Sequence, residues 1–163
     1  MDFSLSEEQE MLKKSARDFL TNECPKTLVR EMAKDERGYT SELWRKMANL
    51  GWMYQNGFGV ERDYIEAMKL YLKAVDDGNA FAMCNIGVLY QNGFGVKTDY
   101  AEARKWYEKA AEVGNSGAMG NLGSLYQNGL GVERSPATAK QWYEKAAKSG
   151  YVPARSAPGE QKP

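Results

Sequence analysis

Cys84 is the side chain in the repeating part of this sequence whose type most suggests covalent chemistry. A cysteine nucleophile needs a neighbouring base to remove its proton, and histidine is the usual base. The chain contains no histidine, so the commonest metal ligand is absent as well. Cys84 is therefore interpreted as a small helix residue. Cys24 is the only other cysteine, and this pair fits reduced thiols in a cytosolic protein better than a disulfide framework.

Three glycine-rich turns could be taken for phosphate-binding loops. They read GFGV at residues 57–60 and 93–96, and GLGV at residues 129–132. Phosphate-binding loops follow a strand and carry a lysine with Ser or Thr, or the spacing G-x-G-x-x-G. These turns are expected to join two helices and have neither feature. Acidic pairs such as Glu7-Glu8 and Asp76-Asp77 are interpreted as solvated charges at helix ends. We therefore expect no catalytic residue, no cofactor, no metal site and no enzyme.

Tyrosines and tryptophans recur at helical spacing and could suggest base stacking. The chain has 22 basic and 22 acidic side chains and no net charge, whereas a nucleic-acid-binding surface needs a basic patch. No apolar run approaches the roughly 20 residues of a membrane span. The aromatic residues are therefore predicted to be core, and neither nucleic acid nor membrane is expected as a partner. They are Tyr54, Tyr71, Tyr90, Trp106, Tyr107, Tyr126, Trp142 and Tyr143.

These residues belong to an internal repeat with a period of 36 residues. LGWMYQNGFGV at residues 50–60 returns as IGVLYQNGFGV at 86–96 and as LGSLYQNGLGV at 122–132. A fixed period in this range is typical of solenoids, in which each repeat is one unit stacked on the next. The sequence therefore predicts an all-α solenoid of helix-turn-helix repeats.

Each repeat is predicted to contain a helix A, a glycine turn, a helix B and a glycine stop. Asn-Gly dipeptides at 56–57, 92–93 and 128–129 would end helix A with a left-handed residue. The middle helix A is predicted over about 80–92. Asp63, Asp99 and Ser135 are good N-caps for helix B. The stop glycines are Gly78, Gly114 and Gly150.

A glycine inside helix A needs a packing reason, since it lowers helix stability by up to about 1 kcal/mol relative to alanine. Gly51, Gly87 and Gly123 occupy the same position in successive repeats. Small residues on helix B would let the two helices approach closely there, with a tyrosine or tryptophan filling the next layer. The small residues are Ala67, Ala103 and Ala139.

The repeat pattern is LG-x-x-Y-x-x-G-x-GV-x-x-D-Y-x-x-A-x-x-W-Y-x-KAA-x-x-G, over about residues 50–149. It resembles the Sel-one-like repeat, a relative of the tetratricopeptide repeat with a longer turn between its helices. The resemblance implies a right-handed α-solenoid that serves as an adaptor or scaffold and binds partners on the concave face lined by helix A.

By analogy with tetratricopeptide domains, a peptide or protein partner would lie on that concave face. Asparagines at one repeat position resemble those that hold a ligand's backbone or carboxylate. The positions that would complete a carboxylate clamp hold Cys84, Val88, Gly120 and Ser124 instead, so a family-consensus asparagine without a ligand is an equal alternative. The candidate binding residues are Asn49, Trp52, Gln55, Asn85, Val88, Gln91, Asn121, Ser124 and Gln127.

The residues before Leu50 lie outside the repeating motif. MDFSLSEEQEMLKKSARDFL at residues 1–20 and SELWRKMANLGWM at residues 41–53 resemble the N-terminal helical segment of the acyl-CoA dehydrogenases. No residue lines up with that family's flavin or catalytic positions. The resemblance implies a borrowed helical fragment: two helices that cap the array and a third that continues into the first repeat.

We expect three parts: residues 1–53 as the dehydrogenase-like segment, 41–150 as three repeats sharing its last helix, and 151–163 as a C-terminal tail. Two functions are considered. The first, which the sequence favours, is an engineered fusion without catalytic activity, built by sharing one helix between two fragments. The second is a natural adaptor that binds a peptide or protein on helix A. A cytoplasmic, soluble protein is expected, with weak self-association through its C-terminal end, where Trp142 and Tyr143 lack a full following repeat.

Overall fold

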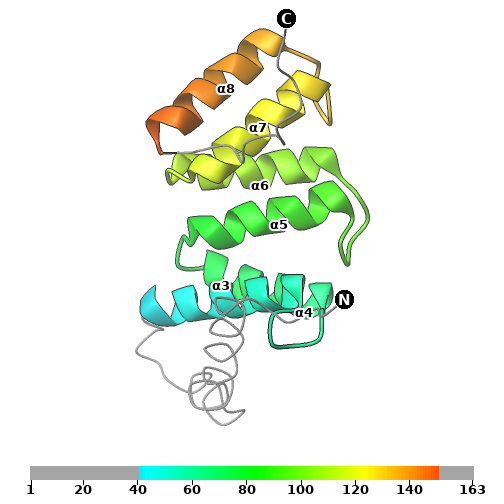
Figure 1. Ribbon diagram of the computed structural model, residues 1–163, viewed down its shortest axis with the longest axis vertical. Helices are drawn as coiled ribbons and strands as arrows, with labels where there is room; N and C mark the ends of the chain where they lie inside the picture. The colour runs from blue at the N-terminus through cyan, green and yellow to red at the C-terminus, as the bar shows by residue number, and fades with distance from the viewer. Residues whose placement is uncertain (1–40, 151–163) are drawn as a thin grey trace, which may run out of the picture. The chain divides into compact units, whose positions relative to one another are not determined.

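The computed structural model describes residues 41–150, and side chains from residue 44 onward. This part is all helical and contains no strand. The chain divides into two compact units, residues 1–82 and 83–163, which are described separately. The helices are α3 (Ser41–Asn56), α4 (Tyr64–Val75), α5 (Ala80–Asn92), α6 (Tyr100–Glu112), α7 (Ser116–Asn128) and α8 (Pro136–Lys148). Helix A of the three repeats is α3, α5 and α7, and helix B is α4, α6 and α8 (Figure 1).

Each helix B begins at a side chain that caps it. The Asp63 carboxylate accepts hydrogen bonds from two backbone N–H groups in the first turn of α4, both at 2.9 Å. Asp99 accepts one at 2.9 Å in α6, and Ser135 one at 3.3 Å in α8. Such caps satisfy N–H groups that have no partner inside the helix. All three predicted N-caps are confirmed.

Each helix A ends at a glycine with positive φ, as expected. Gly129 follows α7 with φ 68° and donates its N–H to the Leu125 carbonyl. Gly131 has φ 65°, and a Cβ atom on it would lie 2.7 Å from the backbone carbon of Tyr100. Only glycine fits where the backbone is both left-handed and this close to another segment. The turn after α7 therefore packs on the start of α6. The predicted stops Gly78, Gly114 and Gly150 also have positive φ, at 73°, 89° and 84°.

In the first unit, α3 packs against α4. Leu50 of α3 is buried, and Ala67, Tyr71 and Ala74 of α4 are inaccessible to solvent. A Cβ atom on Gly51 would lie 2.8 Å from Cε1 of Tyr71 and 3.2 Å from the Ala67 carbonyl oxygen. The glycine therefore makes room for the tyrosine ring and the alanine backbone, which is the packing reason expected from the sequence.

In the second unit, α6 packs against α7, and α7 against α8; Figure 1 shows α5, α6, α7 and α8 following one another in chain order. Gly87 of α5 faces Tyr107 of α6, and an added Cβ would lie 2.5 Å from Cε1 of that ring. Gly123 of α7 faces Tyr143 of α8 in the same way, at 2.6 Å. The largest fully buried side chains of this unit are Ile86, Leu89, Tyr107, Leu122 and Leu125.

The prediction that the aromatic residues are core is right for two of them and incomplete for the others. Tyr71 and Tyr107 are fully buried, but Tyr143 is 39% exposed. Trp106 and Trp142 are half-buried, and a lysine one turn later lies over each ring with Nζ 4.4 Å from the centroid. Cation–π contacts of this kind occur at surfaces where one face of the ring remains accessible. The tryptophans therefore lie at the edge of the core.

Candidate functional site

The second unit brings together the predicted binding residues of α5 and α7. Cys84, Val88 and Gln91 are spaced by four and three residues, so they share one face of α5. Asn121 of α7 reaches this face, because its side-chain Nδ2 donates to the Cys84 sulfur at 3.8 Å. The α5–α7 surface is the name used below for Cys84, Val88, Gln91, Asn121, Ser124 and Gln127. Gln127 is exposed and the other five are half-buried, so a partner could reach all of them.

The remaining predicted residues lie elsewhere. Asn85 is half-buried on α5. In the first unit, Asn49 of α3 is exposed, and the Trp52 ring packs on Phe58 of the following turn with centroids 4.9 Å apart. Gln55 accepts a hydrogen bond from the Tyr71 hydroxyl at 2.8 Å. Trp52 and Gln55 therefore contribute to the internal packing of their own repeat.

The Gln55–Tyr71 contact recurs in the second unit, where the Tyr107 hydroxyl donates to Oε1 of Gln91 at 2.8 Å. Burial is the main cause that raises the Tyr107 pKa, with the nearby Cys84 thiolate a smaller one. The phenol therefore stays neutral and able to donate. The bond fixes the Gln91 amide with its oxygen toward the core, so its two N–H groups are left for another acceptor.

The glutamine–tyrosine contact was not predicted from the sequence. A signal for it exists, because glutamine and tyrosine recur 16 residues apart in every repeat: Gln55 and Tyr71, Gln91 and Tyr107, Gln127 and Tyr143. Glutamine was instead assigned to the partner-facing surface alone. In the structure Gln91 has both roles. Its side-chain oxygen accepts a hydrogen bond from the buried Tyr107, and the residue is also part of the half-buried α5–α7 surface.

Cys84 is an unreactive type of thiol. Burial raises the pKa of its thiol from 9.0 to about 11, and the hydrogen bond from Asn121 opposes this rise only in part. The thiolate is the nucleophilic form of cysteine, and a buried thiol with a raised pKa is inert at neutral pH. This environment agrees with the interpretation of Cys84 as a structural helix residue.

The helices that form the α5–α7 surface carry no charged residue. Residues 80–92 and 116–128 contain no Asp, Glu, Lys or Arg, whereas α6 and α8 contain ten between them. Several of these charges pair within their own helix: Arg104 with Glu108 at 2.9 Å, and Lys105 with Glu102 at 2.9 Å. Charge and polar amide surface are therefore separated between helix B and helix A.

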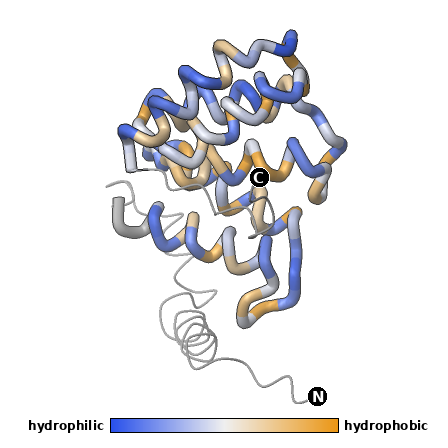
Figure 2. Tube along the Cα trace, turned by 45° about the horizontal axis from the view of Figure 1, so that its top comes forward, coloured by the Kyte–Doolittle hydropathy of each residue, from blue (hydrophilic) through white to orange (hydrophobic). Residues whose placement is uncertain are grey.

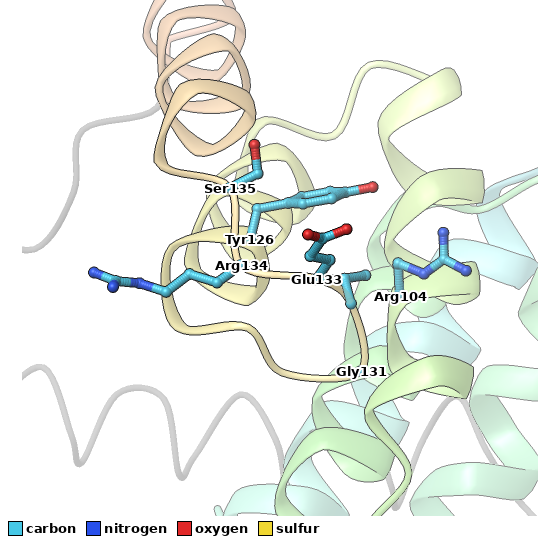
Figure 3. A pocket seen from close by; sticks show the side chains of 7 residues that line it. Arg104, Tyr126, Gly131, Glu133, Arg134 and Ser135 are labelled. Carbon is cyan, nitrogen blue, oxygen red and sulfur yellow. The ribbon is translucent and has the colours of Figure 1, made fainter.

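The glycine turns form shallow pockets. One is lined by Tyr126, Glu133, Arg134 and Ser135 with Arg104 beside them (Figure 3). In Figure 3 the Arg134 guanidinium points away from the Tyr126 ring and the Glu133 carboxylate, and its Nε donates to the Gln127 carbonyl at 3.0 Å. The equivalent turn of the first unit forms the same kind of pocket. Such pockets follow from how the turn closes, since Ser135 N–H donates to the Tyr126 carbonyl at 2.9 Å.

Apolar and polar residues are mixed along every helix (Figure 2). No helix within residues 41–150 is both long and apolar enough to span a membrane. Within the same part of the chain, no three side chains of the metal-ligating types come together.

Pairs of helices that recur every 36 residues and are joined by glycine turns define a helical-repeat protein. The family model of the Sel1 repeat matches residues 47–79, 80–115 and 116–151. These matches cover most of the chain, which therefore belongs to the Sel1 repeat family. The all-α solenoid class predicted from the sequence is confirmed, and so is the repeat resemblance.

Solved structures agree with this assignment. A Sel1 repeat protein from Oxalobacter formigenes has 29% identity and a TM-score of 0.64 over 88% of this chain and 55% of its own. A protective antigen of uropathogenic Escherichia coli with an SLR fold has 33% identity and a TM-score of 0.66 over 87% and 31%. Cysteine rich protein B of Helicobacter pylori shares the fold at 24% identity and a TM-score of 0.55, over 68% of this chain and 85% of its own.

The chain thus spans about half of the first of these proteins and a third of the second. No curated protein matches the sequence.

Proposed function

We propose that this chain is a protein-interaction module that holds a peptide or protein segment on the α5–α7 surface. Sel1 repeat proteins are a family of protein-interaction adaptors, and the chain has three such repeats. The observation that carries the proposal is the Gln91 amide. Its oxygen is held by Tyr107 at 2.8 Å, and its N–H groups are left in a fixed orientation on an accessible surface.

The properties of the surface support binding of this kind. A binding site gains affinity when its polar groups are already ordered, because less conformational entropy is lost on association. Gln91 is ordered by Tyr107, and Asn121 by Cys84. Val88 adds an apolar contact beside these amides. The expectation that this chain has no catalytic activity stays a prediction.

A display library of random linear peptides, selected against the full chain, tests the proposal. We expect selected peptides that bind the protein and lose binding when Ser124→Trp fills the middle of the surface. Lys105→Ala, on the exposed side of α6, is the control and should leave binding unchanged. Peptides that bind Ser124→Trp as well as the parent chain would place the site elsewhere and refute the proposal. Circular dichroism melts would show that both variants fold.

The function favoured from the sequence, an engineered fusion through a shared helix, is less well supported than the adaptor and has one structural feature in its favour. Helix α3 runs without interruption from Ser41 to Asn56, through the point where the two sequence patterns meet. The family match begins at residue 47, and the comparisons give no support to a dehydrogenase fragment or a designed origin. The predicted cap within residues 1–40 and the tail at 151–163 lie outside the described residues, and the three-part division of the chain stays a prediction.

A further inference from the structure

The α5–α7 surface has a chemistry that restricts what it can hold. Neither α5 nor α7 contains a charged residue. A charged partner side chain buried here would lose water without gaining a counter-ion, which is costly. The surface therefore discriminates against charged segments by leaving their charges unpaired, which is one way for a site to be specific.

The polar groups of the surface are neutral amides and a hydroxyl, and at Gln91 the acceptor side is already occupied, so that residue offers donors. The Gln91 oxygen is taken by Tyr107, so its amide offers N–H groups. Asn121 uses one N–H on the Cys84 sulfur at 3.8 Å and retains a second. The Ser124 oxygen already accepts a long hydrogen bond from Asn128 at 3.4 Å, which leaves its hydroxyl hydrogen to donate. Neutral groups of this kind match the neutral main chain of a peptide, and the Gln91 N–H groups match its carbonyl acceptors.

Main-chain carbonyls supply such acceptors in any extended peptide, because an isolated strand has no internal partner for them. We propose that the α5–α7 surface binds an extended, uncharged peptide segment by donating to its main-chain carbonyls, with Gln91 as the central donor. This inference rests on the proposed function and adds the chemical class of the partner. A segment that presents a terminal carboxylate or charged side chains is the competing possibility.

Gln91→Glu separates the donor role of this residue from its structural role. A glutamate keeps an oxygen for the Tyr107 hydroxyl but has no N–H group, and it adds a negative charge to the surface. Gln141→Glu makes the same change at an exposed position of α8 and serves as the matched control. Because the Tyr107 contact is retained, we expect both variants to melt at the temperature of the parent chain.

Three pools of acetylated, amidated linear peptides are used as probes: one uncharged, one with Asp and Glu, and one with Lys and Arg at the same density. We expect the parent chain to enrich the uncharged pool about tenfold over the two charged pools. Gln91→Glu should lower the affinity for the uncharged pool about tenfold. Gln141→Glu should bind as the parent does. Affinity should change less than about twofold between low and high salt, because no ion pair is formed.

A gain-of-function variant completes the test. Ser124→Lys places a cation on the surface and should shift the preference to the acidic pool, whereas Ala137→Lys on exposed α8 should not. Enrichment of a charged pool on the parent chain, with Gln91→Glu without effect and Ser124→Trp still abolishing binding, would overturn this inference and leave the proposed function intact. Binding of no pool would overturn both.

Discussion

The Tyr107 hydroxyl donates to Oε1 of Gln91 at 2.8 Å, joining the core of helix B to the accessible face of helix A. Tyr71 and Gln55 make the same contact at 2.8 Å in the first unit. The tyrosine ring fills the space left by a helix A glycine, so one residue both packs the repeat and orients a surface amide. Stability and surface chemistry are therefore linked through this hydroxyl.

Tyr107→Phe removes the hydroxyl and keeps the ring. We expect the free energy of unfolding to fall by about 0.5–1.5 kcal/mol, because the buried end of the ring loses its hydrogen bond and Gln91 is no longer oriented. Urea unfolding followed by circular dichroism gives this value. Tyr100→Phe is the control, since Tyr100 is half-buried and its hydroxyl makes no hydrogen bond within residues 41–150. Equal losses for both variants would contradict a specific role for the Gln91 contact.

The sequence predicts the backbone of the repeat better than its side-chain contacts. N-caps, left-handed glycines and the bounds of α5 depend on residues within one turn of each other, so they follow from local rules. The Gln91–Tyr107 contact joins residues 16 positions apart on two helices. Its geometry depends on how closely the helices approach, and no local rule specifies that distance.

Gly87→Ala tests the close approach of α5 and α6. The added Cβ would lie 2.5 Å from the fully buried Tyr107 ring, and overpacking of this kind costs about 1–3 kcal/mol. The better helix propensity of alanine offsets up to about 1 kcal/mol of this cost. We expect a net loss of unfolding free energy in urea titrations.

Gly123→Ala is the matched comparison within the same unit. Its Cβ would lie 2.6 Å from the Tyr143 ring, but that ring is 39% exposed and has room to shift toward solvent. We expect its cost to be smaller than that of Gly87→Ala. The close-packing explanation would be wrong if the two variants lost the same stability.

Alkylation of Cys84 should be slow, and the pH dependence of its rate should reflect the raised pKa of the thiol. In a Cys24→Ser chain, the rate with iodoacetamide should rise up to about pH 11, the pKa that burial gives this thiol. Near pH 8 the raised pKa lowers the thiolate fraction about a hundredfold relative to the unfolded chain. Asn121→Ala removes the hydrogen bond that opposes the rise, so its profile should move to still higher pH. A profile centred near 9 in the folded chain would contradict the burial of this sulfur.

The same shift predicts how stability depends on pH. The folded state favours the protonated thiol, so this contribution to stability is complete below the unfolded pKa of 9.0 and is lost as pH rises toward about 11. Cys84→Ala should remove the part of the alkaline loss that belongs to this group. Urea midpoints measured across this interval, for both chains, give the comparison.

Self-association through the C-terminal end is expected from the exposure of Tyr143. The equivalent Tyr107 is fully buried, whereas Tyr143 of the last repeat is 39% exposed. An exposed aromatic side chain can pack on a second copy of the chain, because removing its apolar surface from water is favourable. We expect the mass from light scattering to rise with concentration, and Tyr143→Arg to suppress the rise. Leu72→Arg, at a residue of α4 that is 45% exposed, should not. A constant monomer mass for the parent chain would refute the expectation.

The exposure of Tyr143 illustrates what a repeat pattern leaves out. Tyr107 and Tyr143 occupy the same position of the repeat and differ in burial, because helix α7 follows α6 and packs against it. Identical sequence letters therefore predict identical local conformation but not identical environment. The missing information is which neighbour each copy has.

Among the helices of the second unit, only α6 and α8 carry charged residues, and this also bears on how a protein of this kind changes through mutation. Substitutions between uncharged residues on α5 and α7 can alter the amides of the α5–α7 surface without changing net charge, and so without changing colloidal behaviour. Substitutions on α6 and α8 can adjust net charge without altering the partner-facing side chains. If the proposed function holds, partner choice and solubility can evolve independently in the second and third repeats, since each depends on a different helix of the 36-residue unit.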